Sequence, residues 1–331
     1  MTVRALVVDD SPTIRAMVTQ ALSRDADIEV VGTADTAPAA RAMIKALDPD
    51  VLTLDIEMPG MNGLDFLDKI MRLRPMPVVM LSSQTRRGAD ATLRALELGA
   101  FECLSKDDPS LLAEVVKAAA TSHRGPRAMA SPIAPPADYH ARPDALIAIG
   151  ASTGGVEALS ALLAGFPRDC PPTVIVQHMP ATYTATFAAR LDRMVRPIVT
   201  EARHGAPLRA GCVYLAPGGG QHLEVVGAAN RCCRLVDGAR VSGHRPSVDR
   251  LFHSVARTAG AAAVGAILTG MGADGAEGLK AMRDVGAITL GQDEDSSLIY
   301  GMPAVAHRVG ALSAQLPLSR IAARLLQECR A

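Results

Sequence analysis

Short apolar segments alternate with helix-like segments over residues 1–121. Short apolar runs bounded by Gly, Pro or Asp are typical of buried strands. Five occur, at Val3–Val8, Ile28–Gly32, Val51–Leu54, Val78–Leu81 and Phe101–Leu104. Apolar residues recur at helical spacing between or after them, as at Ile14, Met17, Val18, Ala21 and Leu22, and again at Leu111, Leu112, Val115, Val116 and Ala119. Five successive β–α units predict an α/β domain in which helices cover both faces of a parallel sheet.

The alternating pattern stops over residues 122–143. This stretch is rich in proline and alanine and has few large apolar side chains; its prolines are Pro126, Pro132, Pro135, Pro136 and Pro143. Such a composition cannot bury a core, so we predict a semi-extended linker here.

The β–α pattern returns over residues 144–331. The clearest predicted strands are Ala145–Ile149, Thr173–Gln177, Cys212–Ala216 and Ala263–Leu268. Val248, Leu251, Phe252 and Val255 follow the spacing of an amphipathic helix. Between Gly218 and Ser242, the segments Leu223–Val226 and Arg234–Val236 flank a turn and predict an antiparallel hairpin. We therefore expect a second, doubly wound parallel α/β domain with a hairpin added to it.

Composition narrows the class of protein. The 331 residues carry 34 Lys plus Arg and 34 Asp plus Glu, so no net charge favours nucleic acid or a membrane surface. The six cysteines form no C-x-x-C pair or zinc spacing, which indicates reduced thiols and a cytoplasmic protein. The apolar stretch from Ala259 to Leu268 is too short to cross a bilayer, and Met1 leads directly into a strand pattern, so we expect neither membrane insertion nor a signal peptide.

Polar residues gather at the predicted strand ends of the first domain. Asp9 and Asp10 end the first strand, Asp55 the third and Ser82 the fourth, and Lys106 follows the fifth. Carboxyl ends of parallel strands meet at one edge, where these carboxylates would repel one another unless a cation such as Mg²⁺ bound them. Lys106 and Ser82 would then contact a phosphoryl group on Asp55. Alternatively, each aspartate caps the helix that follows it; the joint placement of all of them favours a site.

The same residues resemble a response-regulator receiver domain, which has a flavodoxin-like (βα)5 fold. The motifs are Val-Asp-Asp-Ser at 8–11, Asp-Ile-Glu-Met-Pro at 55–59, Gly-Met-Asn-Gly at 60–63 and Leu-Ser-Ser at 81–83. The resemblance implies that a histidine kinase phosphorylates Asp55 and that Asp10, Asp55 and the backbone carbonyl of Glu57 hold Mg²⁺, with Asp9 assisting. Two positions depart from the family, Asp107 in place of the usual proline and Cys103 in place of a common aromatic residue. Neither alters the phosphoryl chemistry, but the usual readout depends on the aromatic side chain that Cys103 replaces.

A glycine-rich turn, 150–155, follows the first strand of the second domain. Its sequence Gly-Ala-Ser-Thr-Gly-Gly allows three interpretations. The turn would bind a phosphate through its backbone N–H groups. It also fits Gly-x-Ser-x-Gly, which exposes Ser152 as a nucleophile. In the third interpretation, Ser152 or Thr153 simply caps the following helix.

Two further strand ends supply the partners that a serine nucleophile needs. His178 follows the second strand of this domain and is a candidate general base. Asp274 follows the strand Ala263–Leu268 and would orient that base. Asp274 with Glu277 also resembles a capping box, but a cap does not require glycines at 270, 272 and 275. These glycines favour a backbone close to substrate, with the Met271 N–H as an oxyanion donor.

The chain order Ser152, His178, Asp274 differs from that of α/β-hydrolases. No Gly-x-Gly-x-x-G motif follows the first strand of this domain, which argues against dinucleotide binding. The chain instead resembles the chemotaxis receptor methylesterases, in which a receiver is fused to a protein-glutamate methylesterase domain. The motifs lie at 150–155, Gln-His-Met-Pro at 177–180, Ala-Pro-Gly-Gly at 216–219, Arg-Pro-Ser-Val-Asp at 245–249, and Leu-Thr-Gly-Met-Gly-Ala-Asp-Gly at 268–275.

This resemblance implies a domain division of 1–121, 122–143 and 144–331 and a serine-hydrolase mechanism. Ser152 is then the nucleophile, His178 the base and Asp274 its orienting acid, with Met271 and Thr153 beside the reacting atoms. The implied substrates are glutamate methyl esters and selected glutamines of chemoreceptors, with the chemotaxis histidine kinase as phosphodonor and no cofactor for hydrolysis. The resemblance also implies that the unphosphorylated receiver blocks access to the catalytic face.

Two other functions compete with the esterase. A phosphorylation-switched adaptor would bind receptors or the kinase without turnover, and only activity distinguishes it from the enzyme. A DNA-binding regulator would need a helix-turn-helix pattern or a basic stripe, and the second domain shows neither.

Overall fold

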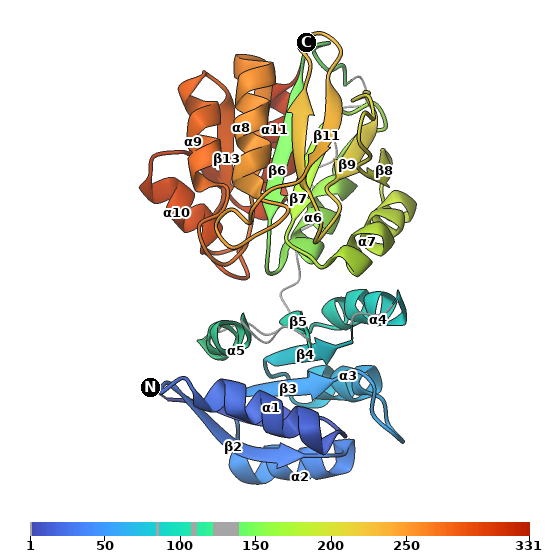
Figure 1. The fold of residues 1–331 in the computed structure, drawn as a ribbon, viewed down its shortest axis with the longest axis vertical. Helices are drawn as coiled ribbons and strands as arrows, with labels where there is room; N and C mark the ends of the chain where they lie inside the picture. Colours follow the sequence, from blue (N-terminus) through green and yellow to red (C-terminus); the bar gives the residue numbers. More distant parts are fainter. Residues whose placement is uncertain (1, 84–85, 107–110, 122–138) are drawn as a thin grey trace. The chain divides into compact units, whose positions relative to one another are not determined.

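The computed structural model describes residues 2–83, 86–106, 111–121 and 139–331 (Figure 1). The chain forms two compact units, Met1–Ala128 and Met129–Ala331, and each has its own parallel sheet and its own core. All six cysteines are free. No helix in the described ranges has both the length and the apolar character needed to cross a bilayer.

The first unit is built on a five-stranded parallel sheet of order β2-β1-β3-β4-β5. This is the flavodoxin-like order, so the predicted fold is confirmed. The strands are β1 (Val3–Val8), β2 (Ile28–Ala34), β3 (Val51–Asp55), β4 (Val78–Ser82) and β5 (Glu102–Ser105). The helices are α1 (Pro12–Ser23), α2 (Ala37–Leu47), α3 (Gly63–Leu73), α4 (Arg86–Glu97) and α5 (Leu112–Thr121).

The loops after β1 and β3, which carry the predicted aspartates, each lead into a helix that is capped by another residue. Ser11 caps α1 by accepting the N–H of Ile14, and Asn62 caps α3 by accepting the N–H of Asp65. The aspartates at the strand ends therefore do not cap these helices. Helix α1 packs against α5 and α3 against α4, and right-handed crossovers place these pairs on opposite faces of the sheet.

The second unit is built on a seven-stranded parallel sheet of order β14-β13-β12-β6-β7-β9-β8. Its strands are β6 (Leu146–Ala151), β7 (Thr173–Gln177), β8 (Ile198–Glu201), β9 (Cys212–Leu215), β12 (Ala263–Ile267), β13 (Ile288–Gln292) and β14 (Ala314–Leu316). A separate antiparallel hairpin pairs β10 (His222–Val226) with β11 (Cys232–Val236). The doubly wound sheet and the hairpin are both confirmed.

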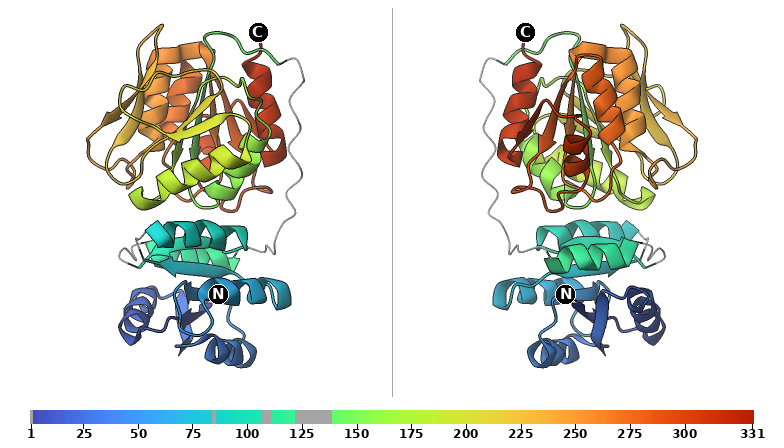
Figure 2. Two further views of the ribbon diagram at one scale, coloured as in Figure 1. Left: turned by 90° about the vertical axis from the view of Figure 1, so that its right-hand side faces the viewer. Right: turned by 90° about the vertical axis from the view of Figure 1, so that its left-hand side faces the viewer.

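Two helical layers cover this sheet, and Figure 2 shows them on opposite sides. One layer holds α8 (Val248–Ala259), α9 (Ala276–Asp284) and α10 (Met302–Arg308), with β10 packed against α8. The other holds α6 (Gly155–Ala164), α7 (Ala181–Met194) and α11 (Leu318–Glu328). The strands are added in opposite directions from β6, since α6 leads to β7 on one side while β12 lies on the other.

Three strands of the second unit were not predicted. Strand β13 carries polar Thr289 and Gln292 in the core, which interrupts its apolar pattern. The Thr289 hydroxyl donates to the Ala311 carbonyl at 2.6 Å, and the Gln292 amide donates to the Ser296 carbonyl at 2.7 Å. Both buried donors therefore have hydrogen-bond partners. Strands β8 and β14 are short, partly exposed edge strands with no continuous apolar run.

The predicted linker falls mostly on residues 122–138, which lie outside the described residues. Its last part, 139–143, is packed on the second unit. Tyr139 is buried, the Arg142 N–H donates to the Cys329 carbonyl at 2.8 Å, and the Ala331 N–H donates to His140 at 3.0 Å. Residues 139–143 therefore pack with the second unit.

Candidate functional site

Three of the predicted site residues lie at or just after the carboxyl ends of β6, β7 and β12, which are neighbours in the sheet of the second unit. Ser152 directly follows β6, His178 directly follows β7, and Asp274 lies in the loop after β12. Because β7 and β12 flank β6, this is the topological switch point, where open α/β sheets form their sites.

The turn at Ser152 is held by backbone contacts and not by a side-chain cap. Helix α6 begins after Gly154, whose φ of 77° favours glycine, and no side chain caps it. The proposed capping roles of Ser152 and Thr153 are therefore wrong. The N–H groups of Ser152 and Gly155 already donate to the carbonyls of Thr269 and Ser152, at 3.1 and 2.7 Å, so they are not available to a phosphate. The serine hydroxyl remains as the chemically distinctive group of the turn.

Gln177 joins the serine turn to the histidine loop. Its Nε2 donates to the backbone carbonyls of Ser152 at 2.8 Å and His178 at 3.1 Å. A Cβ at position 155 would lie 1.9 Å from the Gln177 Oε1, so only glycine allows this contact. Gln177 is the first residue of the Gln-His-Met-Pro motif, but no role was predicted for it from the sequence.

His178 and Asp274 form a buried pair. Nε2 of His178 lies 2.8 Å from Oδ2 of Asp274, and the two side chains are 8% and 0% exposed. Nδ1 of His178 is buried and has no hydrogen-bond partner within the described part of the chain. The carboxylate therefore orients the ring with Nε2 as the donor and leaves Nδ1 as the unpaired acceptor nitrogen of the ring.

The carboxylate of Asp274 also accepts hydrogen bonds from the N-terminus of α8. Ser247 Oγ and the Asp249 N–H donate to Oδ1 at 2.8 and 3.0 Å, and the Val248 N–H donates to Oδ2 at 2.7 Å. Burial opposes the charge, but these bonds and the one from His178 outweigh it and hold the pKa of Asp274 below its ordinary value.

Asp274 is not the start of a capping box, because α9 begins after Gly275, with φ of 97° and no side-chain cap. The aspartate instead accepts hydrogen bonds at the N-terminus of α8, which begins 26 residues earlier in the chain. Its charge is stabilised there by the positive end of the α8 dipole.

His244 stacks on His178 and was not among the residues predicted from the sequence. The rings of His178 and His244 are parallel within 6°, with centroids 3.6 Å apart. Burial, followed by the neighbouring His178, lowers the pKa of His244 to about 4, so this ring is neutral at pH 7. His244 directly precedes the quoted 245–249 motif, and only this position next to a motif would have indicated it.

The loop after β12 lies against the serine. A Cβ at Gly270 would be 2.6 Å from the Ser152 Cβ, so the two backbones approach closely. The Thr269 hydroxyl donates to the Thr153 carbonyl at 3.0 Å and accepts the Ile299 N–H at 2.9 Å, which ties three loops together. The Met271 N–H donates to no acceptor among the described residues. This geometry is compatible with the predicted oxyanion contact.

A second buried carboxyl group, Asp249, lies beside Asp274. It accepts the Gly278 N–H at 2.7 Å, and burial, with the neighbouring Asp274 carboxylate, raises its pKa to about 6. Because the folded state holds this proton more tightly than the unfolded state, ionisation of Asp249 lowers stability as pH rises from about 4 to 6.

Asp249→Asn is therefore expected to stabilise the second unit at pH 8 and to have little effect at pH 4. The amide keeps an acceptor for Gly278 and removes the carboxylate repulsion, so we expect a gain of about 1–3 kcal/mol in the free energy of unfolding at pH 8. Calorimetric unfolding of both proteins at the two pH values measures it. An equal gain at both values would contradict the titration of Asp249.

The first unit brings together the polar residues predicted at its strand ends. Lys106 Nζ lies 2.8 Å from Asp9 Oδ2 and 2.7 Å from Asp55 Oδ1. Burial raises the pKa of Asp55 in spite of this ammonium group. Burial alone would lower the pKa of Lys106, but its bonds to Asp55 and Asp9 raise it. The buried carboxylate of Asp55 is thus paired with one cation at the edge of the sheet.

The donor set of this edge fits a hard divalent cation. One carboxylate oxygen each from Asp9, Asp10 and Asp55 lies within 4.8 Å of the others. Asp9 and Asp55 are buried and Asp10 is exposed, and the Glu57 N–H donates to Asp55 Oδ1 at 3.1 Å. Oxygen-only ligands that leave an open side are typical of Mg²⁺ sites that also bind phosphoryl groups.

The remaining predicted residues of the first unit lie around this edge. Ser82 ends β4, is 2% exposed, and donates its hydroxyl to the Ser83 carbonyl at 3.1 Å. Cys103 has its Sγ 3.6 Å from the Thr92 carbonyl, and burial raises the pKa of its thiol well above the usual value. It is therefore an unreactive thiol at neutral pH. Asp107 lies outside the described residues.

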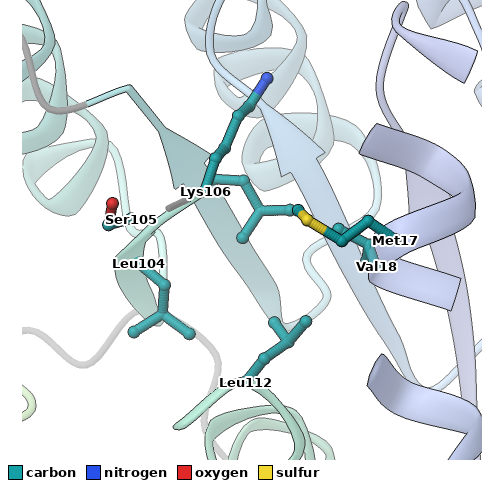
Figure 3. A pocket seen from close by; sticks show the side chains of 7 residues that line it. Met17, Val18, Leu104, Ser105, Lys106 and Leu112 are labelled. Atoms are coloured by element: carbon teal, nitrogen blue, oxygen red, sulfur yellow. The ribbon is translucent and has the colours of Figure 1, made fainter. Parts of the chain in front are cut away.

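A small cavity beneath Lys106 is apolar. Aliphatic side chains from α1, β4, β5 and α5 form most of its lining, which comprises Met17, Val18, Leu81, Leu104, Ser105, Lys106 and Leu112. Figure 3 shows the Lys106 amino group extending away from Leu104 and Leu112. The apolar surroundings hold the lysine stem and direct its charge to the carboxylates.

Comparisons with known proteins match both units. The family model of the CheB methylesterase matches residues 147–325, and that of the response regulator receiver domain matches residues 5–117. A protein from Rhizobium etli named protein-glutamate methylesterase/protein-glutamine glutaminase is 58% identical, over 98% of this chain and 96% of its own. A similarly named protein from Caulobacter vibrioides is also 58% identical, over 98% of this chain and 97% of its own.

A solved structure matches the second unit. The crystal structure of the Thermotoga maritima CheB methylesterase catalytic domain covers 55% of this chain and 97% of its own, with a TM-score of 0.54 and 31% identity. The sequence match and the similarity of fold thus fall on the unit that carries Ser152, His178 and Asp274.

Proposed function

Since this chain belongs to the CheB methylesterase family and carries a response regulator receiver domain, we propose that it hydrolyses glutamate methyl esters on methyl-accepting chemotaxis receptors, releasing methanol. It also deamidates selected receptor glutamines to glutamate, as the names of its relatives imply. The buried contact of 2.8 Å between His178 and Asp274, at the strand end beside Ser152, supports this most directly. The protein acts in the cytoplasm, without nucleic acid and without insertion into the membrane.

Hydrolysis proceeds through an acyl-enzyme. The Ser152 hydroxyl oxygen bonds to the ester carbonyl carbon while its proton passes to Nδ1 of His178. The tetrahedral intermediate then breaks its bond to the methoxy oxygen, which leaves as methanol with the proton from His178. Water attacks the acyl-serine with the same base and releases the glutamate side chain. Glutamine follows the same steps with ammonia as the leaving group.

Asp274 and the glycine-rich loop stabilise the charges that form. The carboxylate of Asp274 stabilises the imidazolium of His178 and maintains its orientation. The backbone N–H of Met271 donates to the oxyanion, and Thr153 lies next to the reacting carbonyl. No cofactor is required for these steps, because the base and the donors belong to the chain.

The receiver unit regulates this activity. Asp55 accepts a phosphoryl group from a chemotaxis histidine kinase, and Lys106 and Ser82 contact that group. Asp10, Asp55 and the Glu57 carbonyl would hold Mg²⁺, assisted by Asp9, and the ion would neutralise phosphoryl charge during transfer. The unphosphorylated receiver limits access of receptors to Ser152, and phosphorylation shifts the population toward the open state.

Methanol release from methylated chemoreceptor membranes tests the proposed activity. The full chain is compared with and without a small-molecule phosphodonor plus Mg²⁺, and Ser152→Ala is the blank. Release that increases with phosphodonor and disappears in the blank supports both the esterase and its switch. No release from a folded protein would instead favour the adaptor.

Asp55→Asn is expected to retain basal methanol release and lose its stimulation by phosphodonor. The amide is close in size to the carboxyl group but cannot form the acyl phosphate. Asp35→Asn is the matched control, because Asp35 is an exposed aspartate just after β2 and lies outside the Lys106 cluster. Persistent stimulation of the Asp55 variant would contradict phosphorylation at this residue.

A further inference from the structure

The hairpin β10–β11 contacts α8 at the end that holds Asp274. His222, the first residue of β10, is 0% exposed. Its Nδ1 accepts the Ser247 N–H at 3.1 Å, and its Nε2 lies 2.9 Å from the Ala239 carbonyl oxygen. Ser247 is the N-cap residue of α8, so the histidine binds the residue from which this helix starts.

These two contacts require one state of the His222 ring. Nδ1 faces an N–H and must be unprotonated, while Nε2 faces a carbonyl oxygen and must carry the proton. A protonated ring would set its Nδ1–H against the Ser247 N–H. Both ring nitrogens are therefore fully used by backbone groups, which is typical of an orienting histidine and leaves neither nitrogen for proton transfer.

Ser247 connects His222 to the catalytic carboxylate. Its hydroxyl donates to Asp274 Oδ1 at 2.8 Å, and the next two backbone N–H groups donate to the same carboxylate. The position of Ser247 thus determines the position of all three donors. A continuous chain of hydrogen bonds runs from the Ala239 carbonyl through His222, Ser247 and Asp274 to His178.

Other contacts fasten the hairpin to α8 farther along the helix. Glu224 accepts from Arg250 Nη2 on α8 and Arg234 Nη2 on β11, both at 2.5 Å. The Val225 N–H donates to Ser254 Oγ at 2.9 Å. These contacts hold the body of the helix to the hairpin, whereas His222 is the hairpin residue bonded to Ser247 itself.

We propose that His222 is a positioning residue for the esterase reaction: by accepting the Ser247 N–H it fixes the N-terminus of α8, and through it the carboxylate that orients His178. The kinetic consequence rests on the proposed function, but the structural consequence at the His178–Asp274 hydrogen bond does not. Loss of the Nδ1 acceptor should loosen this pair without changing the groups that bind substrate.

Two substitutions separate the roles of the two ring nitrogens. In His222→Asn the side-chain oxygen can occupy the place of Nδ1 and accept the Ser247 N–H. In His222→Gln the terminal amide occupies the place of Nε2, so the donor to Ala239 is kept and the acceptor for Ser247 is lost. His204→Gln is the matched control, since His204 contacts the Leu235 carbonyl on β11 and does not contact Ser247.

The experiment measures kcat and KM for methanol release by the full-length protein with phosphodonor and Mg²⁺. We expect His222→Gln to lower kcat about 10–100-fold with KM unchanged, and His222→Asn and His204→Gln to remain within a few-fold of the parent. Ser247→Ala removes the hydroxyl that donates to Asp274 but keeps the N–H that His222 accepts, so it should lower kcat whatever the role of His222. Equal kcat in the Asn and Gln variants would overturn the proposal, and if His222→Gln does not fold, a loss of kcat in His222→Asn of more than a few-fold would overturn it.

A spectroscopic measurement does not depend on turnover. The His178 Nε2 proton bonded to Asp274 should give a downfield proton NMR resonance in the full chain. We expect this resonance to shift or broaden in His222→Gln and to be retained in His222→Asn and His204→Gln. If the parent releases no methanol, the proposed function fails, and the resonance still decides the role of His222. An unchanged resonance in His222→Gln would refute that role.

Discussion

Ser152→Ala is expected to lower kcat for receptor demethylation by about 10⁴–10⁶, because the oxygen that forms the acyl-enzyme is lost. The remaining groups of the site can still bind the ester and polarise its carbonyl, so KM should change little. Methanol release from methylated receptor membranes, with phosphodonor and Mg²⁺, measures the loss.

The fold should not change in this variant. The contacts of Ser152 to the Thr269 carbonyl and to Gln177 are made by its backbone and survive the substitution. Ser160→Ala is the matched control: Ser160 lies on the helix that follows, and its hydroxyl donates to the Val156 carbonyl at 2.7 Å. Activity that survived in Ser152→Ala but fell in Ser160→Ala would exclude Ser152 as the nucleophile.

Residues at the carboxyl ends of strands, or directly after them, were the most predictable parts of both candidate sites. Ser152 and His178 come immediately after β6 and β7, and Asp55 and Ser82 are the last residues of β3 and β4. Parallel pairing then brings strand ends to one edge, so the sequence pattern alone predicts their proximity. The capping alternatives were wrong because other residues, such as Ser11 and Gly154, occupy the cap positions.

Contacts between distant segments were not predictable in the same way. Ser247 and Asp274 are 27 positions apart, and their hydrogen bond arises only when α8 and α9 pack side by side. His222 and His244 lie in a hairpin and a loop, where a single histidine has no periodicity to indicate its partner. The strand β13 was missed for a related reason, since its buried Thr289 is satisfied by the distant carbonyl of Ala311.

Asp274→Asn is expected to lower kcat about 10⁴-fold, with a much smaller effect on KM. The carboxylate accepts four hydrogen bonds in the folded protein, including those from Ser247 and His178. The amide has an NH₂ group in place of one carboxylate oxygen. Because both oxygens of Asp274 face donors, this NH₂ group must also face donors. If the NH₂ faces Ser247, it opposes the Ser247 hydroxyl and the backbone N–H beside it.

If the NH₂ instead faces His178, the ring must present an unprotonated Nε2 to it, and the proton then lies on Nδ1. Nδ1 can no longer accept the proton of Ser152, so the nucleophile is not activated. The charge that stabilises the imidazolium is lost in either orientation. Methanol release should therefore fall in Asp274→Asn, and the downfield His178 resonance should shift upfield or disappear. Both should persist in Asp284→Asn, because that exposed aspartate at the end of α9 is paired with Lys280. An Asp274→Asn variant that kept the activity of its parent would show that the base is oriented by another group.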